Sequence, residues 1–553
     1  MSPIRKPQYV PTPPGISRRE FLRLTSMAGG SLALLLAGCA RAPAPAEAPT
    51  APGGGAGPTV APTMAQKPPA KSSLIIGQAW EPSTLSPITQ LGDSAAGMVY
   101  QNIMNSLVWV DLRNNNKIMP DLATEWSQKD ELTWIFKLRE GVQFHKDFGE
   151  FTAEDVEWNI NDTLENNRPR KFLYFFVKGA KAVDKYTVEI YLEKPFAPFL
   201  VSPVQGTGGY MASKKAFLEM GEEPFGRNPV GTGPFEFKEW LSGDHISLVK
   251  NKNYWKPDRP LLEELTYRPI SDAFVKTTAL KQGEIDFIDL PDYKDVADLQ
   301  NDPNIQVDII PGNNWDYITF NLTRDDLPTS KKEVRQAIGY AIDRQAIVDA
   351  VYYGYATADD DPLPPGFLAA DPDQQKYPDQ PDLEKARELL ATAGHADGFT
   401  IRCMTSDKTN LRRALQLVAD QLSQIGITVE IEGLDLGTFN ARSREQEFEM
   451  ALEDIDIMTG DPDSSLYWFH HTDTIAWHGY IGLDELLDQG RIEQDPGKRV
   501  EIYRTIIDQI LEDAPYLYIA HRNHVFAYRQ GLQGYAAWPN NERNFYAEDL
   551  RWT

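Results

Sequence analysis

The sequence predicts a mixed α/β protein of two or three domains. With 553 residues, the chain is longer than a single hydrophobic core normally supports. From about residue 72 onwards, short apolar runs typical of strands alternate with longer stretches in which apolar residues recur at helical spacing. Residues 399–433 predict a strand, a helix and a second strand, the unit that places two strands in parallel.

The first expected elements are defined by the spacing of their apolar residues. Residues 74–78 form a short apolar run and residues 134–138 alternate with period two, so both predict strands. Ser330 with Glu333 predicts a capping box at the start of a helix. The stripe that this helix would bury consists of Val334, Ala337, Ile338, Ala341 and Ile342.

The parallel unit and the C-terminal region complete the pattern. FTIRCM (399–404) predicts a strand, Asn410 is the expected cap of the following helix, and ITVEIEG (427–433) predicts the second strand. A helix is expected over residues 498–511, and the run YLYIAHRNHVFAY (516–528) after it predicts further strand structure.

The N-terminal segment predicts export and lipid attachment. SRREFLR (17–23) carries paired arginines and resembles the twin-arginine export motif. The apolar run SLALLLA (31–37) is much shorter than the roughly 20 residues of a membrane-spanning helix, as is typical of a signal peptide. LAGC (36–39) resembles a lipobox, in which Cys39 would be acylated and become the mature N-terminus; the alternative is a buried cysteine behind a hydrophobic anchor. Residues 1–39 are therefore predicted to be a lipoprotein signal peptide of the twin-arginine type.

Residues 40–71 are rich in Ala, Pro, Gly and Thr and contain almost no large apolar side chain. Such a composition cannot bury enough surface to fold, so this segment is predicted to be a disordered tether. The two or three acyl chains of a bacterial lipoprotein would hold the protein firmly on the lipid bilayer. The globular body is accordingly expected in the periplasm or cell-envelope space, outside the cytoplasmic membrane.

Charge and motif content exclude several classes of function. A net charge of -25 argues against nucleic acid as a partner and favours a soluble monomer. Two cysteines are too few for a disulfide framework, and Cys403 lies in an apolar strand where burial is expected. The sequence contains no GxSxG, HExxH, GxxxxGK[ST] or CxxC motif, and GTGPF (231–235) predicts a tight turn rather than a phosphate loop. Binding is therefore favoured over catalysis, and no cofactor is expected.

Several stretches, in this order along the chain, together resemble the extracytoplasmic solute-binding proteins of family 5, which serve ABC importers. They are PDLATEWSQKDELTWIFKLREGVQFH (120–145), FTAEDVEWNI (151–160), NPVGTGPFEFKEW (228–240), KNKNYW (250–255), FNLTRDDLPTSKKEVRQAIGYAIDRQAIV (320–348) and GDPDSSL (460–466). The similarity extends from residue 74 to the end of the chain. Members of this family bind oligopeptides, dipeptides, nickel complexes and, in some branches, oligosaccharides.

The resemblance implies a two-lobed clamshell of the type II periplasmic-binding-protein kind, with an extra inserted domain. Lobe one would combine residues 72–115, 225–320 and 521–553, the inserted domain would be residues 116–224, and lobe two residues 321–520. Phe320–Asn321 and Ala520–His521 would then form the hinge. Ligand would bind between the lobes and close them, and ABC permease subunits in the membrane would receive it.

Aromatic side chains are the main candidates for the walls of the ligand cleft, because they offer large contact areas at low entropic cost. They fall into three clusters, early in lobe one, before the expected hinge, and in lobe two. The candidate ligand-binding residues are Trp80, Trp315, Tyr317, Met458, Asp461, Trp468 and Trp477.

The segment DIDIMTGDPD (454–463) leaves the ligand open. Peptide binders of the family often hold the α-ammonium with an aspartate three residues before an Asp-Pro pair, and here Met458 stands three before Asp461. Peptide remains the default expectation, and an oligosaccharide or a metal chelate is the alternative. A hydrolase using paired aspartates from this segment is the alternative from another class.

A metal site is not expected in the histidine-containing segments. His470 and His471 are adjacent and would point in different directions, and His521 and His524 are three apart in a predicted strand. The aspartate run does not fit a calcium loop either, because Thr459 stands where the invariant glycine is needed.

Overall fold

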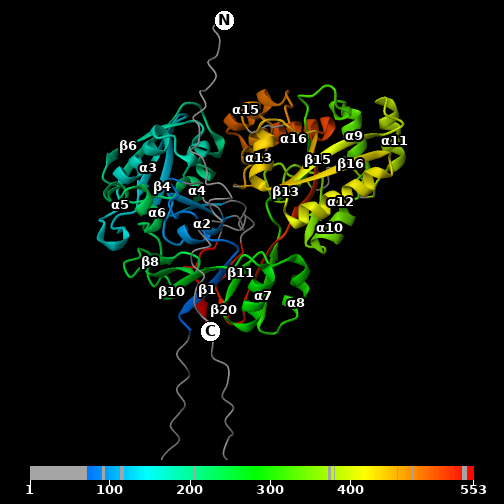
Figure 1. Cartoon of the computed structure of the whole chain (residues 1–553). Coiled ribbons are helices and arrows are strands. Elements are labelled where there is room, and N and C mark those ends of the chain that lie inside the picture. Colours follow the sequence, from blue (N-terminus) through cyan, green and yellow to red (C-terminus); the bar gives the residue numbers. More distant parts are fainter. Residues whose placement is uncertain are drawn as a thin grey trace, which may run out of the picture. The chain divides into compact units, whose positions relative to one another are not determined.

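The computed structural model describes residues 71–89, 94–111, 117–204, 206–371, 375–378, 380–457, 459–474, 478–537 and 545–553 (Figure 1). The chain divides into two units, residues 1–68 and 69–553, and all of the described residues belong to the second. The predicted signal peptide with Cys39 therefore lies outside the described residues. Within the described part, every helix is too short or too polar to cross a membrane.

A seven-stranded sheet with the order β12-β19-β11-β1-β10-β9-β8 forms the first part of the fold, lobe one. Its strands are β1 (Ser73–Gln78), β8 (Phe235–Leu241), β9 (His245–Lys250), β10 (Glu264–Pro269), β11 (Phe287–Asp289), β12 (Ile305–Ile310) and β19 (His524–Arg529). β1 runs parallel to both β10 and β11, and the outer strands join antiparallel. Its helices are α2 (Ser94–Tyr100), α7 (Ala273–Gln282) and α8 (Val296–Gln300), with the 3-10 turn η6 (Tyr293–Asp295).

The inserted domain is a four-stranded antiparallel sheet with the order β4-β5-β7-β6, covered by α3 (Ala153–Glu165). Its strands are β4 (Ala123–Asp130), β5 (Thr133–Leu138), β6 (Val177–Asp184) and β7 (Thr187–Leu192). A hairpin of two strands, β2 (Val108–Asp111) and β3 (Lys117–Pro120), precedes this sheet. The domain is completed by short helices and turns, which are η3 (His145–Asp147), η4 (Pro169–Tyr174), η5 (Ala197–Val201), α4 (Gly206–Gly209), α5 (Lys214–Met220) and α6 (Glu222–Arg227). One continuous hydrophobic core runs through this domain and lobe one.

Lobe two is built on a six-stranded sheet with the order β14-β18-β13-β17-β15-β16. Its strands are β13 (Asn314–Phe320), β14 (Ala356–Ala358), β15 (Phe399–Ser406), β16 (Ile427–Leu434), β17 (Met450–Asp456) and β18 (Tyr516–Arg522). The helices are α9 (Lys332–Ala341), α10 (Arg344–Tyr352), α11 (Leu383–Thr392), α12 (Thr409–Ser423), α13 (Leu436–Arg444), α14 (Trp468–His470), α15 (Asp484–Ile492) and α16 (Pro496–Asp513), with the turns η7 (Pro328–Ser330) and η8 (Asp463–Tyr467). The short pair β20 (Leu532–Gln533) and β21 (Arg551–Trp552) follows β19.

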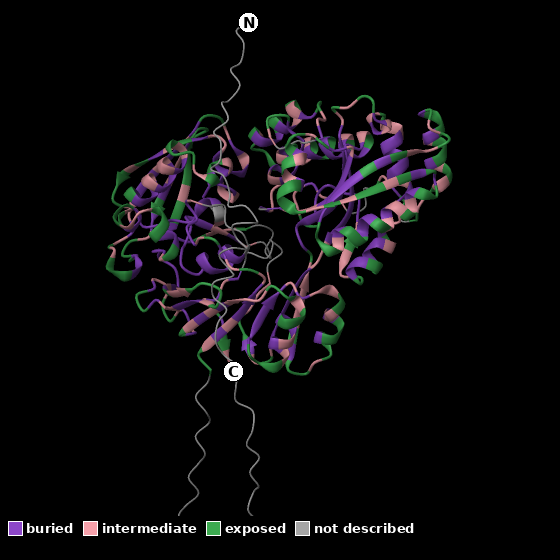
Figure 2. Cartoon of the chain, in the orientation of Figure 1, coloured by how far each residue is buried: buried purple, intermediate pink, exposed green. Residues whose placement is uncertain are grey.

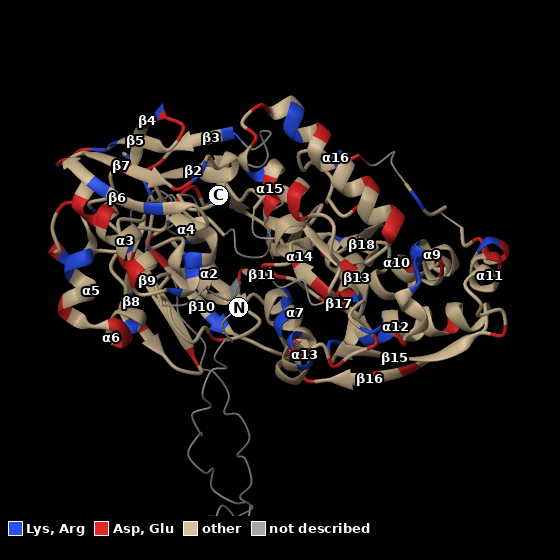
Figure 3. Cartoon of the chain, turned by 90° about the horizontal axis from the view of Figure 1, so that it is seen from above, with Lys and Arg blue, Asp and Glu red and all other residues tan. Residues whose placement is uncertain are grey.

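Burial follows this layered arrangement. The central strand β13 is buried at every position, whereas the edge strand β16 is largely exposed (Figure 2). Acidic and basic residues are interspersed along outer helices such as α16 (Figure 3). The hydrophobic strands are thus covered by helices whose outer faces are charged.

The chain crosses between the two large sheets at positions that differ from the predicted hinge. β12 belongs to the first sheet and β13 to the second, so the first crossing lies at residues 311–313 and not at Phe320–Asn321. The second crossing is Asn523, between β18 and β19, two residues after the predicted Ala520–His521. β13 pairs with β17 and β18, and this pairing assigns residues 314–320 to lobe two.

The two crossings lie against each other. A Cβ atom at Gly312 would stand 2.2 Å from the carbonyl oxygen of Arg522, well inside van der Waals contact. The backbone at residue 312 must therefore be glycine for the segments to approach this closely. Tyr293 of lobe one also donates a hydrogen bond to the carbonyl of Asn523 at 2.8 Å, so a side chain from lobe one holds the second crossing.

Most predicted elements are confirmed, and two predicted helix caps are wrong. The strands at 74–78 and 134–138, the parallel pair β15–β16 and a helix covering 498–511 are present. α9 begins after Lys331, because Ser330 ends a 3-10 turn and its hydroxyl donates to the Asp325 carbonyl. Asn410 is the second residue of α12, and its side chain donates to the Tyr352 hydroxyl instead of capping.

Candidate ligand-binding site

The aspartate-rich segment follows β17 in lobe two. β17 ends at Asp456, and from Asp463 the chain turns into the π-helical turn η8, which continues as α14. Two of its carboxylates are held by arginines from later helices. Asp461 accepts two hydrogen bonds from Arg499, both at 2.6 Å, and Asp463 accepts two from Arg491, at 2.7 and 3.0 Å. Bidentate pairs of this kind fix both partners in position.

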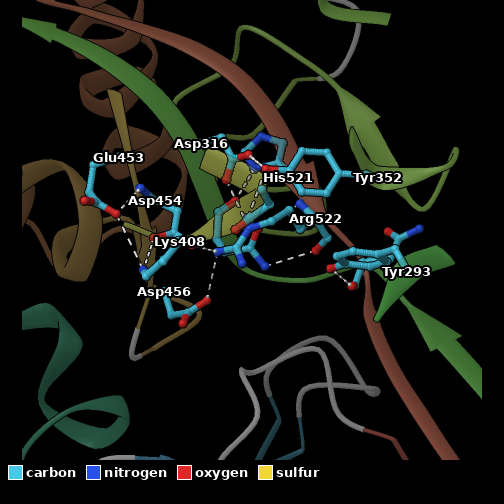
Figure 4. A network of polar contacts seen from close by, with 12 residues as sticks. Tyr293, Asp316, Tyr352, Lys408, Glu453, Asp454, Asp456, His521 and Arg522 are labelled. Carbon is cyan, nitrogen blue, oxygen red and sulfur yellow. Dashed lines mark hydrogen bonds and ion pairs between the residues drawn. The ribbon is translucent and has the colours of Figure 1, made fainter. Parts of the chain in front are cut away.

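The first two aspartates of the segment meet Arg522 at the end of β18 (Figure 4). Arg522 Nη2 lies 3.1 Å from Asp454 Oδ2 and 3.6 Å from Asp456 Oδ1. Its Nε lies 3.0 Å from Asp316 Oδ1, and the other oxygen of Asp316 accepts a hydrogen bond from Tyr352. Because Arg522 immediately precedes the crossing at Asn523, this network joins the aspartate segment to the second crossing.

Acids outnumber bases in this network. Lys408 is the second cation, and it pairs with Asp454 and lies 3.5 Å from Glu453. Arg522 and Lys408 hold the pKa of Asp454 below its ordinary value, although its burial acts in the opposite direction. Burial raises the pKa of Asp316 and of Glu453, so these two carboxyls take up protons more easily than free ones. Asp456 is the most open of the four, with 32% of its side chain exposed.

A cavity of about 200 Å³ lies beside Asp456, between lobe two and the inserted domain. The inserted domain contributes apolar side chains from η4 and η5, and lobe two contributes residues of β17, η8 and α14. The lining residues are Phe172, Leu173, Phe175, Pro198, Ser202, Ile455, Asp456, Thr459, Asp463, Ser464, Trp468 and Phe469. An apolar cavity with a few polar groups at one side is typical of a small-molecule binding site.

Aromatic contacts hold the two sides of this cavity together. The ring centroids of Phe172 and Trp468 are 5.0 Å apart, and those of Phe175 and Trp468 are 6.0 Å apart. The Arg491 guanidinium lies over the rings of Phe175, at 3.8 Å, and Tyr467, at 3.1 Å. Asp463 thus positions a cation that stacks on an aromatic ring from each side.

Trp315 and Tyr317 do not line the cavity, which corrects the prediction that they face a ligand cleft. They are 1% and 2% exposed and belong to the core of lobe two. Trp315 contacts the rings of Phe469 and Tyr518, both at 5.2 Å. β13 lies in the middle of its sheet, and both faces of the strand are packed against other parts of lobe two. The face that carries Trp315 and Tyr317 is therefore covered by protein and not open to a ligand.

The remaining predicted site residues have different positions. Trp468 lines the cavity. Asp461 is paired with Arg499 and lies outside the lining, and Trp80 follows β1 with 45% of its surface exposed. Met458 and Trp477 are outside the described residues.

Sequence reasoning missed the inserted domain's contribution. KFLYFF (171–176) supplies Phe172 and Phe175, and its aromatic density is a signal that could have identified it. Arg491 and Arg522 were also missed, because nothing in their local sequence shows which acids they will meet.

The histidines considered as metal ligands are buried, and two of them, His470 and His478, each contact a separate protein oxygen. His478 Nε2 lies 2.7 Å from the Phe469 carbonyl, and His470 Nε2 lies 3.0 Å from the Tyr518 hydroxyl. Burial lowers the pKa of His478 and of His524 to about 4. Among the residues that the structure describes, no group of three or more His, Cys, Asp or Glu side chains could hold a metal ion.

Two sheets joined by paired crossings, with an aromatic cavity between lobe two and the inserted domain, define a protein that binds a small solute. The acids of the aspartate segment are each ion-paired to a basic side chain, which removes the basis for a hydrolase with paired free carboxylates. Residues 117–477 match the family model described as "Bacterial extracellular solute-binding proteins, family 5 Middle". The chain belongs to this family.

Relatives that bind glutathione or peptides are similar to this protein over most of the chain. The glutathione-binding protein GsiB of Shigella boydii serotype 4 is 30% identical over 489 residues, which cover 85% of this chain and 93% of the relative. The periplasmic binding protein DppA of Helicobacter pylori, solved with the peptide STSA, is 27% identical with a TM-score of 0.75 and covers 87% of this chain and 98% of its own. A dipeptide-binding protein of Pseudoalteromonas sp. SM9913, solved with Met-Leu, is 25% identical with a TM-score of 0.74. The match covers 87% of this chain and 100% of that protein's chain.

Proposed function

We propose that the protein is the substrate-binding component of an ABC importer and that its ligand is a short peptide with a free amino end. It would capture the peptide outside the cytoplasmic membrane and deliver it to the permease subunits. The resemblance to glutathione-binding, peptide-binding and dipeptide-binding relatives supports this class of ligand.

The observation that carries the proposal is the combination of an aromatic cavity with an acid at its edge. Phe172, Phe175 and Trp468 offer apolar surface for the side chains of a peptide. Asp456 also lines the cavity and is the most exposed acid of its network, and its ion-pair partner within the described part of the chain is Arg522, at 3.6 Å. A peptide ammonium placed there would balance part of the surplus negative charge. Asp456 would thereby bind the α-ammonium of the peptide, which the uncharged side chain of Met458 cannot do.

Ligand capture would be coupled to closure at the two sheet crossings. The crossings at residues 311–313 and at Asn523 are the covalent links between the sheets of lobes one and two, so a rotation between the lobes changes backbone angles there. A peptide that contacts Phe172 on one side and Trp468 on the other favours the closed arrangement. Saturating peptide should reduce the radius of gyration measured by X-ray scattering, and an unchanged radius would refute closure.

Anchoring completes the proposed function. Twin-arginine export, acylation of Cys39 and the tether at residues 40–71 would hold a monomeric binding protein at the outer face of the cytoplasmic membrane.

The experiment that tests the proposed ligand is a calorimetric titration of the purified full-length protein with a matched pair of peptides. Met-Leu and N-acetyl-Met-Leu differ in the charge at the amino end. We expect Met-Leu to bind at least tenfold more tightly, and we expect Asp456→Asn to remove most of this preference, because a charge-assisted hydrogen bond contributes about 1.5–3 kcal/mol.

The control is Asp473→Asn, since Asp473 lies outside the cavity lining. It should leave the preference unchanged. Equal affinity for the two peptides would refute the role of Asp456. Saturable binding of an oligosaccharide or a metal chelate, with no binding of any peptide, would refute the peptide assignment.

A further inference from the structure

A second cavity, of about 210 Å³, lies in lobe one and the inserted domain and shares no lining residue with the first. We refer to it as the lobe-one cavity. Its lining residues are Gln101, Asn102, Met104, Asn105, Ser106, Trp109, Asp121, Tyr210, Pro234, Tyr254, Lys256, Gly534, Ala536, Tyr546, Glu548 and Asp549. All of them belong to lobe one or the inserted domain, so the cavity does not depend on the position of lobe two.

Asp121 is a buried carboxylate in this cavity that has neutral partners only. It is 6% exposed and accepts hydrogen bonds from Asn105 Nδ2, at 3.0 Å, and from the Ser106 amide, at 2.9 Å. Within the described part of the chain, no Lys or Arg nitrogen lies within ion-pair distance of it. Burial raises its pKa to about 6, although Lys256 acts in the opposite direction, so in neutral solution it is mostly ionised and its nearest cation is shared with Glu548. A buried charge of this kind is stabilised by a cation.

The other charged groups of the cavity balance one another. Glu548 pairs with Lys256, at 2.7 and 3.0 Å, and also accepts a hydrogen bond from Tyr254. Asp549 pairs with Arg259 at 2.5 Å. Counting Arg259 outside the lining as the partner of Asp549, the site as a whole carries about one negative unit, the charge of Asp121.

A hydrogen-bond donor is also left over. Gln101 is 2% exposed, and its Nε2 has no hydrogen-bond partner among the residues that the structure describes. A buried amide without a partner is costly, and an acceptor oxygen supplied by a ligand would satisfy it. The lining thus offers one negative charge and one free donor to the same occupant.

Aromatic rings are a further part of the lining. Trp109, Tyr210, Tyr254 and Tyr546 contribute ring surfaces, and burial raises the pKa of Tyr210, Tyr254 and Tyr546, so their phenols stay neutral. Aromatic faces and a carboxylate together attract organic cations. A dry cavity of about 150 Å³ holds benzene, so about 210 Å³ suits a ligand of six to eight heavy atoms.

We propose that the lobe-one cavity is a second binding site, which takes a small organic ammonium ion carrying one hydrogen-bond acceptor. The ammonium pairs with Asp121 and the acceptor oxygen receives the hydrogen bond from Gln101 Nε2. The aromatic rings enclose the carbon chain between these two groups.

The test uses the purified full-length protein and three alkyl ligands in a ligand-observed NMR titration. 4-Aminobutan-1-ol carries both features, butane-1,4-diol replaces its ammonium by a hydroxyl, and butylamine lacks its hydroxyl. We expect aminobutanol to bind at least tenfold more tightly than the diol and several-fold more tightly than butylamine.

Two variants assign the effect to this cavity. Asp121→Asn should weaken aminobutanol binding about tenfold or more and leave the diol unchanged. Gln101→Met is the second variant, in case Asp121→Asn fails to fold. We expect it to fold, because it removes an Nε2 group that has no hydrogen-bond partner among the described residues. It should weaken aminobutanol and leave butylamine unchanged. No saturable amine binding, equal binding of amine and diol, or amine binding that Gln101→Met leaves unchanged would each overturn the proposal.

The two proposed sites can fail separately. Trp468→Ala alters the first cavity and should leave aminobutanol affinity unchanged, whereas a loss of amine binding in this variant would overturn the assignment to the lobe-one cavity. Failure of every peptide to bind would refute the proposed function and leave the amine site standing.

Discussion

Replacing Arg522 by Met should destabilise the protein by an amount typical of a broken buried ion pair. Arg522 has 13% of its side chain exposed, and its partners Asp316 and Asp454 have 1% and 7% exposed. The variant leaves both carboxylates buried without this cation, and among the described residues Lys408 remains as the ion-pair partner of Asp454. Removal of one partner of a buried pair costs about 3–5 kcal/mol in the free energy of unfolding.

The assay is urea unfolding at pH 7, followed by tryptophan fluorescence, and the control is Arg504→Met. Arg504 lies 3.7 Å from Asp371 with 52% of its side chain exposed, and such a surface pair contributes about 0–1 kcal/mol. The same change of residue type should therefore have a small effect at residue 504 and a large one at residue 522. Losses of equal size at both positions would refute the argument that burial decides the cost.

The loss at residue 522 should also depend on pH. In the native protein, Arg522 and Lys408 hold the pKa of Asp454 below its unfolded value, and this contribution to stability is present above about pH 4 and is lost on acidification. Without Arg522 the pKa of Asp454 rises, so the difference between variant and native protein should shrink as the pH falls from that raised pKa towards the low pKa of the native protein. A difference that stays constant from pH 7 to pH 3 would show that packing, and not charge, accounts for the loss.

Three further predictions concern the ligand, the anchor and the buried histidines. Trp468→Ala should weaken peptide binding about ten- to hundredfold in calorimetry, and Trp80→Ala should change it less than twofold, since Trp80 lines neither cavity. Cys39→Ser should move the protein from the membrane pellet to the soluble fraction, and unchanged pelleting would contradict lipid attachment. Burial lowers the pKa of His145 to about 4, so its contribution to stability is complete above its unfolded pKa of about 6.5 and is lost as the pH falls towards 4. His145→Gln should accordingly reduce the pH slope of the unfolding free energy by about 1.4 kcal/mol per pH unit in this range, and an unchanged slope would show that His145 is protonated in the folded protein.

Local periodicity predicted the elements better than it predicted their partners. The parallel pair β15–β16 could be expected because the strands and the helix between them are adjacent in sequence. The hinge could not be placed in the same way. β13 pairs with β17 and β18, at least 130 residues further along the chain, and no local pattern shows which sheet it joins.

The candidate site shows the same limit. The alternation of Trp315 and Tyr317 correctly indicates one face of a strand, but whether protein or solvent covers that face depends on α14 and α16, which come much later. The acids of residues 454–463 suggested chemistry because the arginines that neutralise them lie 28–68 residues away in the sequence. Trp468 could be proposed because it follows the aspartate turn directly.

The central claim, that the protein carries a peptide outside the membrane, is tested most directly by native mass spectrometry of protein purified from its own host without denaturation. We expect one released ligand per chain with the fragment ions of a short peptide bearing a free amino end. An oligosaccharide, a metal chelate or an N-blocked peptide as the released ligand would contradict it.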